Sequence, residues 1–160
     1  MLKFAAFIAF STTILLSSAP AYAGGRVVSN DLRSCQSGKG PAVLVRISGL
    51  KDTTGKLRVQ SYRGTKEEWL KSGAWLSRIE FPVTASNVSV CVPFNQTGEY
   101  AIAVRHDLNG NGKTDISSDG GGMSNNPSIS IFNLGKPSYK KTKFALGNEV
   151  KTISISMKYM

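Results

Sequence analysis

Apolar and polar residues alternate with a period of two along most of the chain after residue 41. Such a period places successive side chains on opposite faces of an extended strand, and strands buried on one face show this pattern. The sequence therefore predicts half-buried β-strands at 43–48, 57–62, 76–83, 88–93, 100–106 and 153–159. Pro82 places the third of these at an edge or a bulge, because proline cannot donate a hydrogen bond within a sheet.

Two shorter segments, 128–133 and 139–146, are also predicted to be strands, and a turn at Gly147-Asn148 follows the second. Together with the six alternating segments they make seven or eight short strands separated by turns. That arrangement is typical of an all-β fold, and we expect an antiparallel β-sandwich.

One short helix is predicted near 66–72. Residues 65–68 have the order of a capping box, and a glycine is placed to end the helix. We expect Trp69 and Leu70 to point inward and to cover one edge of the sandwich. An exposed aromatic binding surface that includes Trp75 is the functional alternative.

The first 23 residues differ from the rest of the chain. A short positive start, an apolar run at 4–16 and the small residues around Tyr22 predict a secretory signal peptide cleaved after Ala23. An uncleaved anchor is the alternative, although the apolar run is short for a membrane-spanning helix. Residues 24–160 are then a single domain with an irregular start at 24–40, without a transmembrane span, in the periplasm or outside the cell.

The predicted mature chain contains two cysteines, Cys35 and Cys91. In an oxidising compartment, a pair without an odd thiol predicts one disulfide. This bond would tie the irregular N-terminal segment to a strand in the middle of the domain. A free reactive thiol and a redox pair are less favoured alternatives, since the chain has no Cys-x-x-Cys motif.

A loop rich in Asp, Asn and Gly follows the strand at 100–106. Calcium-binding loops supply oxygen ligands from positions 1, 3 and 5 and place a glycine at position 6, here Gly112. Position 12, where an EF-hand has glutamate, is Ser118, and a strand rather than a helix precedes the loop. The candidate calcium ligands are Asp107, Asn109, Asn111, Lys113 (through its carbonyl), Asp115 and Asp119.

Two interpretations of this loop remain open. Few carboxylates are present and Arg105 opposes them, so we expect a dissociation constant on the order of 0.1–1 mM for calcium, the only cofactor predicted. The Asn-Gly pairs at 109–112 also form turns without any metal, because Asn and Gly tolerate positive φ. The residues expected to support the loop are His106, Gly112, Asn125 and Asn126.

The chain has one histidine, His106. It ends a strand on the face of Ile102 and Val104, and its neighbour Asp107 points to the opposite face, which disfavours a catalytic pair. We expect a buried or half-buried histidine at the mouth of the loop, and we assign no catalytic residue. A hydrolase that uses His106 and Asp107 is the weakest alternative, and zinc is disfavoured because only one imidazole is present.

The chain is basic, with 20 Lys and Arg against 10 Asp and Glu and a net charge of +10. A field of that sign attracts anionic polysaccharide or lipid surfaces. The expected compartment excludes nucleic acid as a partner. A soluble surface whose lysines protect edge strands is the other interpretation. The candidate anion patch is Lys136, Lys140, Lys141 and Lys143.

The stretch GEYAIAVRHDLNGNGKTD, the later SNNP and the final KFALGNEVKTISISMKY resemble a bacterial family known as domain of unknown function 2141. A Gly-Leu turn at 49–50 followed by Gly-x-Leu-x-Val at 55–59 also matches. The likeness covers about residues 41–160. It implies an exported protein with a β-sandwich of the prealbumin or carboxypeptidase-regulatory type, and it implies no activity. The fold class expected overall is a prealbumin-like or Ig-like sandwich.

These observations favour an exported, non-enzymatic binding or accessory module with a weak calcium site between Asp107 and Asp119. The main alternative is a basic envelope-surface protein that binds anionic polysaccharide or lipid.

Overall fold

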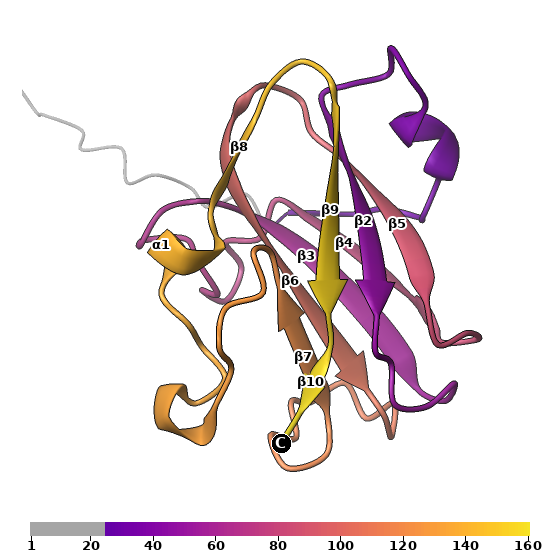
Figure 1. Ribbon diagram of the computed structural model, residues 1–160, viewed down its shortest axis with the longest axis vertical. Helices are drawn as coiled ribbons and strands as arrows, with labels where there is room; N and C mark the ends of the chain where they lie inside the picture. Colours follow the sequence, from indigo (N-terminus) through magenta and orange to yellow (C-terminus); the bar gives the residue numbers. More distant parts are fainter. Residues whose placement is uncertain (1–24) are drawn as a thin grey trace, which may run out of the picture.

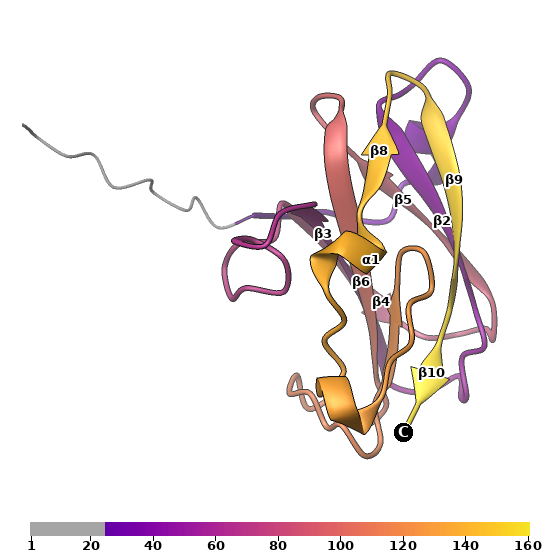
Figure 2. The same ribbon diagram turned by 60° about the vertical axis from the view of Figure 1, so that its left-hand side comes forward.

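A computed structural model describes residues 25–160 (Figures 1 and 2), and the predicted signal peptide at 1–23 lies outside these residues. Two sheets pack face to face. The large sheet has the order β1 (Arg26–Val27), β4 (Ser77–Pro82), β3 (Lys56–Arg63), β6 (Gly98–Asp107), β7 (Gly120–Met123) and β10 (Lys158–Tyr159), with β8 (Phe144–Leu146) paired to β6. The small sheet has the order β5 (Val88–Pro93), β2 (Ala42–Ser48) and β9 (Val150–Ser156).

The predicted all-β sandwich is confirmed, but the sheets are mixed rather than purely antiparallel. In the small sheet β2 and β9 run parallel over their whole length, from Ala42 opposite Val150 to Ser48 opposite Ser156. In the large sheet β1 runs parallel to the start of β4. The chain between β2 and β9 is long enough to cross to the large sheet and return, which a parallel pair requires.

The hydrophobic core lies between the two sheets, as the alternation predicts. Each strand places one set of apolar side chains in this space, and the buried centre is formed by Val43, Val45, Ile47, Leu57, Val59, Ile79, Val90, Val92, Ile102, Val104 and Ile155. After β9 the chain passes to the large sheet through Met157, whose N–H donates to the Ser48 carbonyl. The C-terminal strand β10 therefore ties the two sheets together beside β7 (Figure 1).

The outer face of the large sheet carries a second, smaller apolar cluster. Tyr62 and Trp69 meet edge to face, with 5.4 Å between ring centroids, and both are buried against Ala101 and Met123. The Trp69 indole N–H donates to the carbonyl of Pro137. Trp69 is therefore a packing residue that fastens two covering loops to the sheet.

The prediction of a helix near 66–72 is wrong, because these residues form turns. The segment forms a turn in which the Trp69 N–H donates to the Thr65 carbonyl, and Leu70 then has a φ of 54°, which ends the turn. A helix of this length is marginal in isolation. The packing of Trp69 against the sheet determines the conformation instead.

The strand predicted at 128–133 is also wrong, and the one predicted at 139–146 is confirmed only in its last three residues. The first segment contains the 3-10 turn η2 (Ile131–Asn133), because the Asn133 side chain bonds the backbone of Ser128 and Ser130. The second contains the short helix α1 (Tyr139–Thr142), and a strand follows only at β8. Figures 1 and 2 show this orange segment beside β6 and β7, on the side away from β9.

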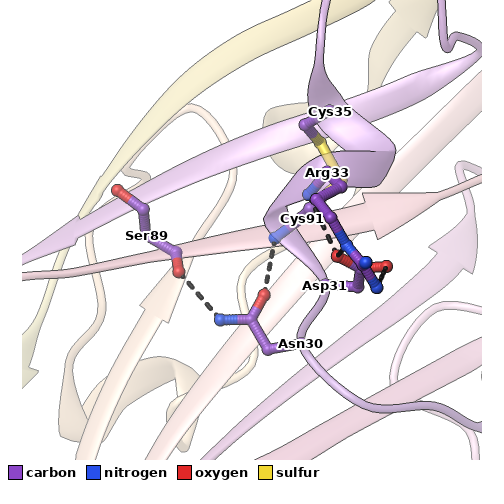
Figure 3. The surroundings of a disulfide bond; sticks show 6 residues. All are labelled: Asn30, Asp31, Arg33, Cys35, Ser89 and Cys91. Carbon is purple, nitrogen blue, oxygen red and sulfur yellow. Dashed lines mark hydrogen bonds and ion pairs between the residues drawn. A yellow bond between two sulfur atoms is a disulfide. The ribbon is translucent and has the colours of Figure 1, made fainter.

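The predicted disulfide between Cys35 and Cys91 is confirmed. It joins the 3-10 turn η1 (Leu32–Cys35) to β5, with 5.7 Å between the Cα atoms (Figure 3). The Asn30 side chain adds two hydrogen bonds to β5, donating to the Ser89 carbonyl and accepting from the Cys91 N–H. The N-terminal segment thus covers the edge of the small sheet. A structural disulfide is typical of exported proteins.

Within residues 25–160, none of the helices has the length and apolar character needed to cross a membrane.

Candidate functional site

The candidate loop, residues 108–119, connects the neighbouring antiparallel strands β6 and β7 of the large sheet. β6 is the longest strand, and it is paired with β3 on one side and with β7 on the other. Its last two residues, His106 and Asp107, are both buried. The loop therefore starts from a fixed position rather than from a frayed strand end.

His106 is fully buried below the loop. Its Nε2 lies 2.8 Å from the Thr54 carbonyl, and its Nδ1 lies 2.7 Å from the hydroxyl of Tyr159. Both ring nitrogens are thus engaged and no solvent reaches them. A general base needs a free nitrogen within reach of its substrate, so in this conformation His106 braces the sheet at the mouth of the loop.

Asp107 holds the loop with one carboxylate oxygen only. Its Oδ2 accepts from the Gly112 N–H at 2.8 Å and from the Arg105 guanidinium at 3.3 Å. Its Oδ1 has no hydrogen-bond partner within residues 25–160, and it is buried, since the side chain is only 2% exposed. A buried carboxylate oxygen without a partner is costly, and this is the most unusual polar group of the loop.

Asn109 and Asn111 fold the next residues into two successive Asx turns. Asn109 Oδ1 accepts from the Asn111 N–H, and Asn111 Oδ1 accepts from the Lys113 N–H. Both amide groups donate to Asp115 Oδ2, at 3.0 and 2.8 Å. These hydrogen bonds hold the pKa of Asp115 below its usual value. The structure thus brings the side chains at positions 3, 5 and 9 of the loop together.

Asp119 braces the end of the loop. Its Oδ1 accepts from the Leu108 N–H and its Oδ2 from the Asp115 N–H, and the side chain is buried. Unlike Asp107, both of its oxygens are therefore occupied by the backbone.

Arg105 is a residue of the site that sequence reasoning did not assign. Its guanidinium crosses the inside of the loop and donates to the Thr114 hydroxyl and the Gly112 carbonyl. Burial lowers the pKa of Arg105, and the neighbouring charge of Arg58 lowers it further. The sequence contained a signal for this role. Arg105 alternates with the core residues of β6 and therefore lies on the outer face of the sheet, beside the Asx loop, where an arginine can neutralise the carboxylates of the loop.

Asn125 and Asn126 do not support the loop directly, because they lie at the other end of β7. Asn125 donates to the Lys143 carbonyl. Asn126 donates to the Ser154 carbonyl and accepts from the Ser156 N–H. Its side-chain amide therefore forms two hydrogen bonds with the backbone of β9, as a neighbouring strand would. Both residues have positive φ, which Asn tolerates.

The four lysines of the candidate anion patch are not equivalent. Lys136, Lys140 and Lys141 are exposed, and within residues 25–160 none of them forms an ion pair. Lys143 is paired with Glu99 at 2.7 Å. The unneutralised part of the patch is therefore the segment that carries η2 and α1.

In the part of the chain that the structure describes, no group of three or more His, Cys, Asp or Glu side chains is arranged to hold a metal ion. A cation in the loop would depend on one or two carboxylates together with amide and carbonyl oxygens. Such oxygen ligands suit calcium, which accepts irregular geometry.

A family model described as "Uncharacterized protein conserved in bacteria (DUF2141)" matches residues 45–154. No curated protein matches the chain. Among solved structures, the fimbrial anchor protein Mfa2 from Porphyromonas gingivalis is similar over 73% of this chain and 50% of its own length, with 10% identical residues and a TM-score of 0.38. This chain thus spans half the length of that protein, and a likeness of this degree carries no argument about function.

Proposed function

The chain belongs to the uncharacterised bacterial family DUF2141, and we propose that it is an exported accessory module that binds calcium weakly in the loop between Asp107 and Asp115. The module acts by binding rather than by catalysis. Calcium fixes the conformation of the loop, which stands at the end of a rigid β-sandwich.

The observation that carries this proposal is the unpartnered Oδ1 of Asp107. Its other oxygen is held by the N–H of Gly112, so the free oxygen has a fixed position. A divalent cation at this oxygen offsets the cost of burying it. Position 1 of a calcium loop supplies a ligand of this kind, and the glycine at position 6 is the residue that fixes it here.

The remaining ligands come from the two Asx turns. Each Asn Oδ1 accepts one backbone N–H and keeps a second lone pair that can face a cation. The Lys113 carbonyl and Asp115 complete the set. Asp119 is left out, because backbone amides occupy both of its oxygens. With two carboxylates and the opposing Arg105, affinity falls in the weak extracellular range, on the order of 0.1–1 mM.

Thermal unfolding with and without calcium tests the proposal. At 10 mM calcium, binding with such a constant stabilises the folded state by about 1.4–2.7 kcal/mol, and the melting temperature rises by roughly 4–8 °C. The change Asp107→Asn removes this increment. Magnesium at the same concentration produces a smaller rise, because it demands stricter octahedral geometry.

Asp52→Asn is the matched control. Asp52 is an exposed aspartate whose side chain, among residues 25–160, bonds only the neighbouring Thr53 N–H, so the control removes the same charge outside the loop. Absence of any calcium-induced shift in the wild type, or an equal shift in Asp107→Asn, contradicts the proposal.

A second function is supported by Lys136, Lys140 and Lys141, which are exposed without acidic partners in the described chain. These lysines suit an anionic polymer or lipid surface. Co-sedimentation with anionic vesicles then weakens steeply as salt rises. The triple change of these lysines to glutamine abolishes it, whereas binding that is insensitive to salt excludes this function.

A further inference from the structure

A cavity of about 420 Å³ lies on the outer face of the large sheet, next to the loop. Its floor is formed by β3, β6 and β7, and its walls by the loop, the segment at 129–136 and the C-terminal residues. This volume falls within the range of small-molecule sites. The cavity does not include Asp107 or the two Asn side chains, so it is separate from the proposed calcium site.

Exposed apolar side chains surround this cavity. Six large hydrophobic residues are exposed in the described chain, and three of them line it: Ile116 at 44%, Leu134 at 67% and Met160 at 41%. Leu70, Met123 and Ile129 line it as well. Exposed apolar surface gathered at a concave site is typical of a ligand-binding groove, and an aliphatic chain would cover it.

Positive charge surrounds the same cavity. Arg58 and Arg105 stand directly opposite each other in the β3–β6 register, an arrangement that is unfavourable for like charges. Glu80 pairs with Arg58 and Asp107 pairs with Arg105, whose Nε is buried and has no hydrogen-bond partner within residues 25–160. Lys136 and Lys158 also line the cavity. Among the lining side chains Asp119 alone is acidic, and its oxygens already accept backbone N–H groups.

The floor of the cavity is left open by a glycine. A Cβ added to Gly120 would meet the Tyr159 ring at 2.5 Å, and one added to Gly122 would meet Ile155 at 2.6 Å, so these two glycines are needed for core packing. A Cβ added to Gly121 would meet only Ile129 Cδ1, at 3.8 Å. Packing does not require a glycine at 121, and its lack of a side chain leaves volume for a ligand.

We propose that this cavity binds an amphipathic anion, a single aliphatic chain that carries a carboxylate or phosphate head group. The chain lies over Gly121 against Met123, Ile129 and Leu134. The head group reaches the cationic rim formed by Arg58, Lys136 and Lys158. This binding does not depend on calcium in the neighbouring loop.

Isothermal titration of the protein with three twelve-carbon probes below their critical micelle concentrations tests the proposal. Dodecanoate and dodecyl phosphate carry the two anionic head groups, and dodecyl maltoside carries a neutral one. We expect at least one anion to bind tenfold or more tightly than the maltoside, and the better anion identifies the head group. No binding of either anion, or equal binding of the neutral probe, overturns the proposal.

The change Gly121→Leu fills the floor and should weaken anion binding by tenfold or more. Gly147→Leu is the matched control: its Cβ meets no atom within 4 Å, and it lies in the turn between β8 and β9, away from the cavity.

The double change Lys136→Gln and Lys158→Gln removes two exposed charges that folding does not require, and it should abolish the preference for anions. Unchanged affinity in Gly121→Leu, or an unchanged preference in the lysine variant, overturns the assignment.

Discussion

Tyr159 and His106 lie 53 residues apart in the chain and are joined by a hydrogen bond of 2.7 Å below the loop. The Thr54 carbonyl can only accept, so His106 Nε2 carries a hydrogen, and in that tautomer Nδ1 is the acceptor. The Lys51 N–H donates to the Tyr159 oxygen, and the tyrosine hydroxyl then donates to His106 Nδ1. The C-terminal strand is in this way connected to the base of the candidate site.

Removal of this hydroxyl by Tyr159→Phe leaves the buried Nδ1 of His106 without a donor. We expect a loss of about 1–3 kcal/mol in the free energy of unfolding, the typical cost of a buried unsatisfied group. Denaturant unfolding measures it. Tyr139→Phe is the control, because the Tyr139 hydroxyl makes no hydrogen bond within residues 25–160 and its loss should cost less than about 0.5 kcal/mol. Equal losses in the two variants contradict the interpretation.

Two of the three glycines of β7, Gly121 and Gly122, should respond differently to substitution. Gly122→Ala places a methyl group 2.6 Å from Ile155, a rigid and fully buried side chain, and we expect overpacking to cost about 1–3 kcal/mol. Gly121→Ala places its methyl group at an ordinary contact distance of 3.8 Å from Ile129 Cδ1 and reduces the freedom of the unfolded chain, so it should be neutral or stabilising by up to about 1 kcal/mol. Thermal unfolding of both variants compares them, and equal melting temperatures contradict this distinction.

Residue patterns predicted the fold well where local alternation determines it. The sequences of β3 and β6 have one apolar face each, and both are found as strands with that face in the core. The pattern could not show that β2 and β9 are parallel, because pairing direction depends on how the intervening chain crosses between sheets. Nor could it place α1, where four residues without clear alternation follow Pro137.

Only those features of the candidate site that involve residues close together in the sequence could be predicted. The Asn-x-Asn-Gly spacing predicts the two Asx turns, because each involves residues two positions apart. The free oxygen of Asp107 and the bracing by Asp119 depend on the three-dimensional path of the loop. The cavity combines Gly121, Leu134 and Met160 from three separate segments, and no sequence signal connects them.

The ion pair between Arg58 and Glu80 should make stability depend on pH. Two hydrogen bonds from Arg58 hold the pKa of Glu80 below its ordinary value of 4.5. Because the folded-state pKa is the lower one, this stabilisation is complete above pH 4.5 and is lost as the pH falls through the folded value. Melting temperatures of wild type and Glu80→Gln should therefore differ at pH 6, and this difference should shrink as the pH falls below 4.5.

Since the pair is partly exposed, we expect this difference to be at most about 1 kcal/mol. Glu149→Gln is the control, because Glu149 is exposed and forms no ion pair in the described chain. A difference between wild type and Glu80→Gln that stays constant from pH 6 to pH 3 contradicts the assignment.

The disulfide should contribute strongly to stability. It closes a loop with a sequence separation of 56, which corresponds to about 4 kcal/mol in the chain-entropy model. The double change Cys35→Ala and Cys91→Ala should lower the free energy of unfolding by about that amount. Addition of a reductant should destabilise the wild type but leave the double variant unaffected. An equal response of both proteins to reductant contradicts this role.

Substitution of Asp119 should distinguish residues that stabilise the loop from residues that bind calcium. Asn at this position has one acceptor oxygen instead of two, so either the Leu108 or the Asp115 N–H loses its partner, and Asp119→Asn should cost about 1–3 kcal/mol without calcium. The increment produced by 10 mM calcium should nevertheless remain, whereas Asp107→Asn should lose it. Thermal unfolding of both variants with calcium and with chelator measures the two effects separately. Loss of the calcium increment in Asp119→Asn would make Asp119 a ligand rather than a brace, and would extend the site to the end of the loop.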